Sequence, residues 1–188
     1  MKQWISMALA VLMLMLLTMT GAGATSISLE QQFDNDYYEI YVPANFEIDT
    51  SEAKDEENYH FIAYLMEDSD EGLVMESAAR YYESMADVSL LYGMDEDVYQ
   101  NYVDEILDIF EEDKPEYIGF CMAGMQLFAM FKCEDETGPY LYAETMCNGM
   151  EIHFYGYWND ASFEYTTEIT YDRQTLFELI LASFYPHV

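Results

Sequence analysis

Basic side chains are scarce in this sequence. Its 188 residues contain 6 lysines and arginines against 37 aspartates and glutamates, which gives a formal net charge of −31. A chain of this charge repels other polyanions, so we expect no binding to nucleic acid and none to an anionic membrane surface. Hydrophobic residues nevertheless make up 52% of the chain and aromatic residues 16%. The sequence therefore carries enough apolar material for a folded core.

Cysteine and histidine are also few. The three cysteines (Cys121, Cys133 and Cys147) and three histidines follow none of the paired spacings of a zinc site. We expect neither a bound metal nor a cofactor. An odd cysteine count in an exported protein leaves at least one free thiol. The strand spacings expected below hold the cysteines further apart than the ~7 Å between Cα atoms that a disulfide allows. The sequence therefore predicts three unpaired, mostly buried thiols.

Signatures of catalysis are missing as well. No Gly-x-Ser-x-Gly nucleophile elbow occurs, and a buried free cysteine usually acts as a small hydrophobic residue. The acidic segment from Glu67 to Gly72 invites a calcium interpretation, but its acids do not follow the alternate spacing of an EF-hand loop. We interpret it as a charged hairpin turn. The sequence assigns no catalytic residue and no metal ligand.

Residues 1–24 have the composition of a secretory signal peptide. Lys2 precedes an apolar run from Ile5 to Leu17, and Ala22-Gly23-Ala24 has the small-x-small pattern of a cleavage site. The run is shorter than the ~20 residues of a spanning helix, which argues against a membrane anchor. We expect cleavage near Ala24 and secretion from a bacterial cell. No cysteine lies near that site, so we expect no lipoprotein.

The remaining chain is expected to fold as one α+β domain over residues 36–188, after a flexible, polar leader over residues 25–35. Alternating apolar residues predict strands at 37–42, 59–66, 73–76, 117–122, 125–134, 141–147 and 150–158. A helix is expected at 95–112, with Asp95 as its N-cap, and another at about 172–184. Residues 77–94 are expected to form helical turns or a long connection, and residues 159–169 an edge strand or a loop.

The Asn148-Gly149 pair predicts a two-residue hairpin turn and therefore a register. Cys147 faces Met150, Thr145 faces Ile152 and Ala143 faces Phe154 on what we expect to be the core face. On the other face Met146 lies opposite Glu151, Glu144 opposite His153 and Tyr142 opposite Tyr155. The preceding turn is longer, and we take Glu134 to face Tyr140 there.

A family resemblance follows from the order of these elements. The opening strand running into Pro43-Ala44-Asn45-Phe46 and the closing segment from Phe177 to Phe184 are similar to the PsbP-like sandwich proteins, which include the DcrB-like exported proteins. The resemblance implies an antiparallel sheet with helices packed on its faces, an α/β/α sandwich. It also implies a non-enzymatic binding or accessory role. It supplies no shared active site, so no functional residue is carried over.

The candidate binding residues are Tyr142, Glu144, His153, Tyr155 and Tyr157 on the second face of the hairpin. Aromatic rings beside acids can hold a cation or stack on a sugar. The plainer interpretation is that the tyrosines pack under a helix and that Glu144 and His153 form an ordinary cross-strand pair.

Two functions remain open at this point. The first is an exported binding or accessory domain that contacts a cationic protein or peptide through an acidic, tyrosine-rich surface. The alternative is a secreted glycan hydrolase that uses paired carboxylates. The acidity could also serve solubility alone. Nothing in the sequence fixes the oligomeric state.

Overall fold

The computed structural model describes residues 27–56, 59–69, 71–159 and 166–187, and the expected signal peptide lies outside these ranges. The described part is a mainly antiparallel β structure with two α-helices, so the α+β class expected from the sequence is confirmed. No helix within the described ranges is long and apolar enough to cross a membrane.

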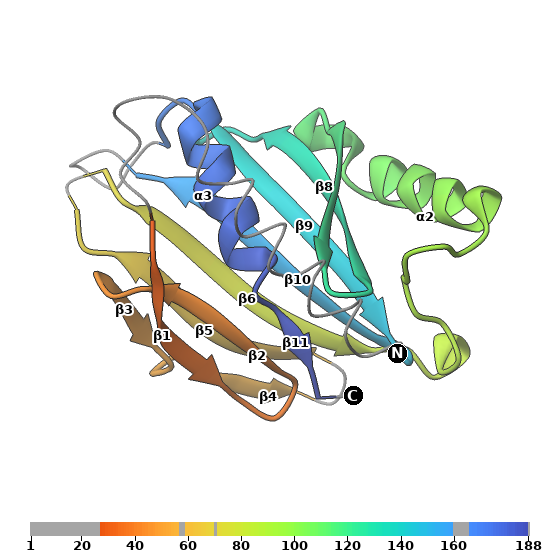
Figure 1. Ribbon diagram of the computed structural model, residues 1–188. Coiled ribbons are helices and arrows are strands. Elements are labelled where there is room, and N and C mark those ends of the chain that lie inside the picture. Colours follow the sequence, from red (N-terminus) through yellow and green to blue (C-terminus); the bar gives the residue numbers. More distant parts are fainter. Residues whose placement is uncertain (1–26, 57–58, 70, 160–165, 188) are drawn as a thin grey trace, which may run out of the picture.

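A large antiparallel sheet forms the centre of the molecule (Figure 1). Its strands follow the order β3-β5-β6-β10-β9-β8-β7, and β4 pairs with β5 outside this path. The strand bounds are β3 Phe46–Asp49, β4 Lys54–Glu56, β5 Tyr59–Glu67, β6 Leu73–Tyr81, β7 Glu116–Ala123, β8 Gln126–Glu134, β9 Pro139–Cys147 and β10 Met150–Trp158.

A second, three-stranded sheet lies beside the first and corrects the prediction of a flexible leader over 25–35. Within that range Leu29–Asp34 forms β1, which pairs with β2 (Tyr38–Pro43), and the short C-terminal strand β11 (Tyr185–Pro186) pairs with the other side of β2. Only Phe33 of β1 is buried. Backbone pairing with β2 therefore holds this segment in place. The segment has no apolar face that would have marked it as a strand in the sequence.

The β9–β10 hairpin has the register that Asn148-Gly149 predicts. Cys147 pairs with Met150, Glu144 with His153 and Tyr142 with Tyr155. Asn148 and Gly149 both have positive φ angles, 48° and 80°, as the preferred hairpin turn requires. A Cβ atom on Gly149 would also lie 2.8 Å from the Cα of Ala86, so a glycine is needed there for space as well.

The β8–β9 register differs by one residue from the expected one. Cys133, not Glu134, faces Tyr140, and Glu134 faces Pro139. This shift places Cys133 in the apolar cluster beside α2. All three cysteines are nevertheless free and buried, as predicted.

Strand β6 corrects the prediction for residues 77–94. It continues to Tyr81 and pairs along its whole length with β10, from Leu73 opposite Trp158 to Tyr81 opposite Met150. The 3₁₀ turn of Glu83–Met85 begins only after that. The alanines Ala78 and Ala79 occupy buried positions in the sheet, where their small side chains gave no clear strand pattern in the sequence.

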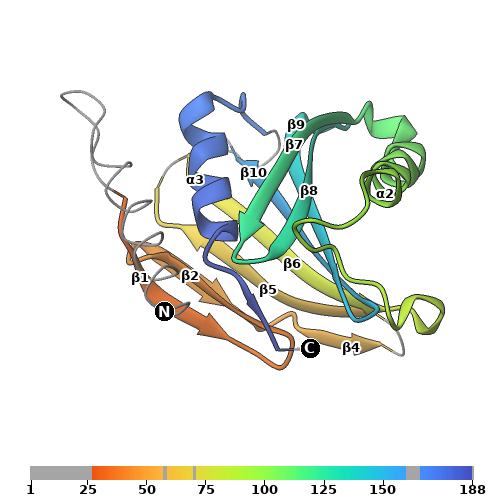
Figure 2. The same ribbon diagram turned by 45° about the vertical axis from the view of Figure 1, so that its right-hand side comes forward.

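The two helices contact alternate residues of the same strands. Helix α3 (Tyr171–Leu181) buries Phe177, Ile180 and Leu181 in the cluster that contains Phe128 and Met130 of β8. Helix α2 (Glu96–Ile109) buries Val103 and Ile106 in a second cluster, with Ala129 and Phe131. Asp95 caps α2 as expected, by accepting from the backbone N–H of Asp97 at 2.9 Å. Figure 2 shows strands of the large sheet between the two helices.

Gly156 lets α3 approach the large sheet closely. A Cβ atom at this position of β10 would lie 2.5 Å from the ring of Phe177, a distance that real side chains do not tolerate. Phe177 is fully buried. The missing side chain at Gly156 therefore makes room for the buried Phe177 ring of α3.

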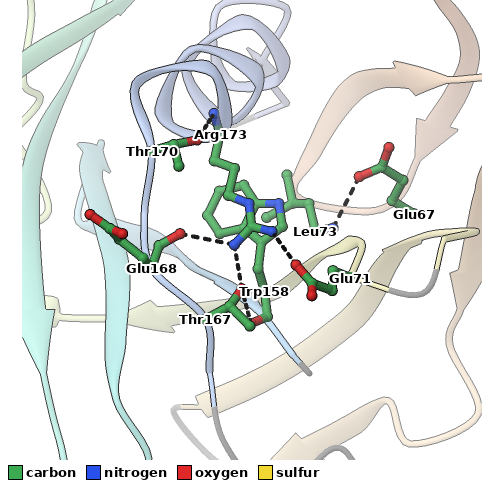
Figure 3. Close-up of polar contacts among 8 residues, drawn as sticks. All are labelled: Glu67, Glu71, Leu73, Trp158, Thr167, Glu168, Thr170 and Arg173. Carbon is green, nitrogen blue, oxygen red and sulfur yellow. Dashed lines mark hydrogen bonds and ion pairs between the residues drawn. The ribbon is translucent and has the colours of Figure 1, made fainter. Parts of the chain in front are cut away.

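Arg173 links the first turn of α3 to the acidic β5–β6 turn by hydrogen bonds (Figure 3). Its guanidinium donates to Glu71 Oε2 at 2.8 Å, to the carbonyl oxygen of Glu168 at 2.8 Å and to Thr167 Oγ1, and it lies 5.7 Å from the centre of the Trp158 ring. In the same turn Glu67 accepts from the backbone N–H of Leu73. Two acids that suggested a calcium loop are therefore engaged by protein donors.

Candidate functional site

The five residues singled out from the sequence lie on the side of the large sheet that faces α2, and they divide into two groups. Tyr142, Glu144 and His153 are buried, with exposed fractions of 2%, 6% and 4%. Tyr155 and Tyr157 are only partly buried and line a cavity. Tyr155 and Tyr157 also pack against the cluster that α2 helps to form, but they keep a surface that faces the cavity.

Glu144 is the centre of the buried group. Its two carboxylate oxygens accept hydrogen bonds from the hydroxyls of Tyr102, on α2, and Tyr142, on its own strand. His153 does not pair with Glu144 as expected: its Nδ1 lies 2.9 Å from Oε1 of Glu151, two residues earlier on β10. The cross-strand neighbours are therefore correct, but the ionic partner of His153 is a residue that the sequence analysis did not select.

The pKa of Glu144 is raised to about 8. Burial is the largest cause, and the neighbouring Glu151 carboxylate adds to it, while the hydrogen bonds from Tyr102 and Tyr142 act in the opposite direction. Burial together with Glu144 also raises the pKa values of Tyr102 and Tyr142. At neutral pH Glu144 therefore keeps its proton, because ionising two adjacent buried carboxyl groups costs too much free energy.

The same group supplies possible metal ligands. One ligand atom each from Glu144, Glu151 and His153 lie within 4.8 Å of one another. Carboxylate and imidazole ligands of this kind suit several divalent ions. However, both oxygens of Glu144 and the Nδ1 of His153 already have protein partners, so the arrangement is complete without an ion.

The cavity lies beside this group, at the C-terminal end of α2, and has a volume of about 470 Å³. It combines three tyrosines and a phenylalanine with three acids, and no lysine, arginine or histidine among the described residues lines it. The lining residues are Glu76, Phe110, Asp113, Asp135, Thr137, Tyr140, Tyr155, Tyr157, Asn159 and Thr166.

Hydrogen bonds hold the three acids of the cavity in place. The Tyr157 hydroxyl donates to Glu76 Oε1 at 2.7 Å, and the Tyr140 hydroxyl donates to Asp113 Oδ2 at 2.6 Å. Asp135 Oδ1 accepts from the Thr137 hydroxyl and from two backbone N–H groups. Burial opposes ionisation of Asp135, but these donors together lower its pKa. The cavity thus presents oriented acceptors beside aromatic rings.

Among the acids and tyrosines of the cavity, sequence reasoning missed four: Glu76, Asp113, Asp135 and Tyr140. Tyr140 could have been found, because it lies two residues before Tyr142 and so on the same face of β9. Glu76 faces Tyr155 through the β6–β10 pairing, which joins strands far apart in the sequence. Asp113 lies in the short 3₁₀ turn after α2 and Asp135 in the β8–β9 turn, and neither segment is long enough for a periodicity to mark a face.

No model of a known protein family matches this chain, and no curated protein matches its sequence. Among solved structures it is similar to the solution structure of cyanobacterial PsbP (CyanoP) from Synechocystis sp. PCC 6803. The two are 15% identical, the match covers 90% of this chain and 99% of the other, and the TM-score is 0.42. This structural neighbour carries the name of the family that the sequence resembles.

Proposed function

We propose that this protein is an exported, non-enzymatic binding or accessory domain, built as an α/β/α sandwich, which contacts a cationic protein or peptide through an acidic, tyrosine-rich surface. The cavity of about 470 Å³ is the observation that carries the proposal. Small-ligand pockets have volumes of this order and combine apolar walls with a few oriented polar groups. The walls here are aromatic, and the charged groups are acids.

The charge of the whole chain supports the same partner. A formal net charge of −31 attracts cations from a distance and repels polyanions. Acids that only served solubility would be spread over the exposed surface, whereas Glu76, Asp113 and Asp135 converge on one cavity. The expected partner is therefore a positively charged protein or peptide.

The glycan hydrolase alternative is less well supported. Its general acid needs a carboxyl group with a raised pKa that reaches the substrate. Glu144 has the raised pKa, but it is buried against Tyr102 and Tyr142 and does not line the cavity. Asp135 lines the cavity, but its pKa is lowered. The two requirements thus fall on different residues.

Binding to cationic proteins at two salt concentrations tests the proposal. We expect the purified protein to bind a subset of basic secreted proteins and peptides, and the affinity to fall when salt is raised from 50 to 500 mM. Binding that is insensitive to salt would contradict an electrostatic contact. A screen against cell-wall and plant glycans tests the alternative, and hydrolysis of any of them would favour it.

A further inference from the structure

The cavity at the end of α2 concentrates negative charge at one place, beyond the general acidity of the chain. Its three acids come from three different segments: Glu76 from β6, Asp113 from the 3₁₀ turn after α2, and Asp135 from the β8–β9 turn. Like charges held around one cavity repel one another, which costs free energy. A cationic occupant would offset that cost.

The end of helix α2 adds to the negative potential. Phe110, which caps the C-terminus of α2, and Asp113 both line the cavity, and the last turn of the helix contains no basic residue. The C-terminal end of a helix carries about half a negative charge. The adjacent Lys114 is directed to Glu134, 3.3 Å away. The helix end therefore lacks the compensating cation that a last turn commonly supplies.

The carboxylates retain acceptor capacity. Each of Glu76 and Asp113 accepts one tyrosine hydroxyl, through Oε1 and Oδ2 respectively. These two hydrogen bonds use one oxygen of each carboxylate and leave Glu76 Oε2 and Asp113 Oδ1 outside them. Burial and these acids raise the pKa values of Tyr157 and Tyr140. The tyrosine hydroxyls thus keep their protons and donate hydrogen bonds to the carboxylates. This orients each carboxylate so that it can accept a hydrogen bond from a ligand.

The aromatic walls distinguish an organic cation from a bare metal ion. The rings of Tyr140 and Tyr155 lie 5.8 Å apart, and Phe110 meets Tyr155 edge-on at 6.5 Å. Ring faces attract the diffuse charge of a guanidinium or ammonium group, whereas hard divalent ions prefer a shell of oxygen ligands. The cavity combines both kinds of contact, which suits a cation with an apolar stem.

Two guanidinium groups of the protein lie over aromatic rings, and one of them also pairs with a carboxylate. Arg173 pairs with Glu71 while it lies against the Trp158 ring (Figure 3), and Arg80 lies 5.3 Å over the Tyr59 ring. A guanidinium has five donors in a plane that can stack on a ring while it meets carboxylates at its edge. Lysine offers a compact charge without that planar face.

We propose that the cavity receives the guanidinium group of an arginine side chain from the partner protein. The plane of the guanidinium lies against Tyr155, and its N–H groups donate to Glu76 and Asp113. This inference rests on the proposed function, because it names the contact by which a cationic partner is recognised. It goes further by placing that contact in one cavity and by choosing arginine over lysine.

Titrations with small probes test the inference. N-acetyl-arginine amide, its lysine counterpart and the neutral, nearly isosteric citrulline counterpart are added to the purified protein, and binding is followed by NMR chemical shifts. We expect arginine to bind at least tenfold more tightly than citrulline and more tightly than lysine. Equal binding of citrulline, or tighter binding of lysine, would overturn the choice of a guanidinium. Tighter binding of free spermidine would assign the cavity to a polyamine instead.

Variants locate the contact. Glu76→Gln and Asp113→Asn should each weaken arginine binding at least fivefold, while Glu116→Gln, an equal charge change at an exposed position of β7, should not. Two separate cavity variants keep the test valid if one of them fails to fold, which thermal unfolding would reveal. Unchanged arginine binding in both folded variants would overturn the inference.

One result separates this inference from the proposed function. If a cationic protein binds in a salt-dependent manner but equally well to wild type, Glu76→Gln and Asp113→Asn, the cavity is not the contact and the binding function stands. If no cationic protein or peptide binds to the wild type, the proposed function itself fails.

Discussion

The Tyr157 hydroxyl donates a hydrogen bond to Glu76 Oε1 at 2.7 Å and so links β10 to β6 at the wall of the cavity. The two residues are not directly opposite, because Tyr157 pairs with Val74 and Glu76 with Tyr155. The bond is therefore diagonal across the two strands. It orients the carboxylate that we expect to meet a bound cation.

A double-mutant cycle measures this link. We expect Tyr157→Phe to lower the free energy of unfolding by about 1 kcal/mol, because it removes one part-buried side-chain hydrogen bond. Glu76→Gln and the double variant complete the cycle, which should give a coupling of at least about 0.5 kcal/mol. Tyr185→Phe serves as the control, since Tyr185 is 65% exposed. Additive effects at Tyr157 and Glu76 would show that the contact is not formed in solution.

The buried Glu144 predicts a particular pH dependence of stability. Its pKa is about 8 in the folded protein, compared with about 4.3 in an unfolded chain. Between these values the folded state keeps a proton that the unfolded state loses. This group therefore makes the free energy of unfolding fall as pH rises from about 4 to about 8, by at most about 1.4 kcal/mol per pH unit.

Glu144→Gln should remove that contribution. The amide cannot ionise, so the variant should gain stability relative to wild type as pH rises from 5 to 8. Urea unfolding at several pH values measures the difference. Glu116→Gln, at an exposed position, should follow the wild-type profile. A profile for Glu144→Gln that runs parallel to the wild type would mean that Glu144 ionises normally in the folded protein.

Gly156→Ala should be destabilising because of Phe177. The added methyl group would lie 2.5 Å from the phenylalanine ring, and overpacking of this kind costs about 1–3 kcal/mol. Phe177→Leu removes the ring, so the methyl group should cost less in a Phe177→Leu background than in the wild type. Thermal unfolding of the four proteins gives the comparison. An equal cost in both backgrounds would place the strain elsewhere.

The cysteines should be unreactive in the folded protein. Burial raises the pKa values of the Cys121 and Cys147 thiols to about 12 and that of the Cys133 thiol to about 11, so almost no thiolate forms at pH 8. We expect slow labelling of the native protein and three reactive thiols per chain after denaturation without a reductant. Fewer than three would indicate a disulfide.

Sequence reasoning succeeded where structure is local. The six residue pairs that Asn148-Gly149 predicted are all present in the β9–β10 hairpin, and Asp95 marked the start of α2. The β8–β9 register was wrong by one residue because the longer Asp135–Gly138 turn allows several pairings. Strand β1 was missed because Phe33 is its only buried residue. Its order depends on pairing with β2, and the sequence alone carries no sign of that pairing.

The candidate site was predictable only in part, for a related reason. Tyr155 and Tyr157 could be placed on one face from strand periodicity, and both line the cavity. Whether Tyr142 and Glu144 on that face are exposed depends on where α2 lies, and α2 covers them. The tertiary fold, and no local sequence pattern, brings three acids to the cavity: Glu76, Asp113 and Asp135. Among 37 acids the sequence offered no means of selecting them.

Intermolecular nuclear Overhauser effects between an arginine-containing peptide and the protein test the central claim most directly. The account predicts contacts from the Cδ protons of the arginine to the rings of Tyr155 and either Tyr140 or Tyr157, and their loss in Glu76→Gln. Contacts confined to exposed tyrosines outside the cavity, such as Tyr171 or Tyr185, which are 82% and 65% exposed, would contradict it.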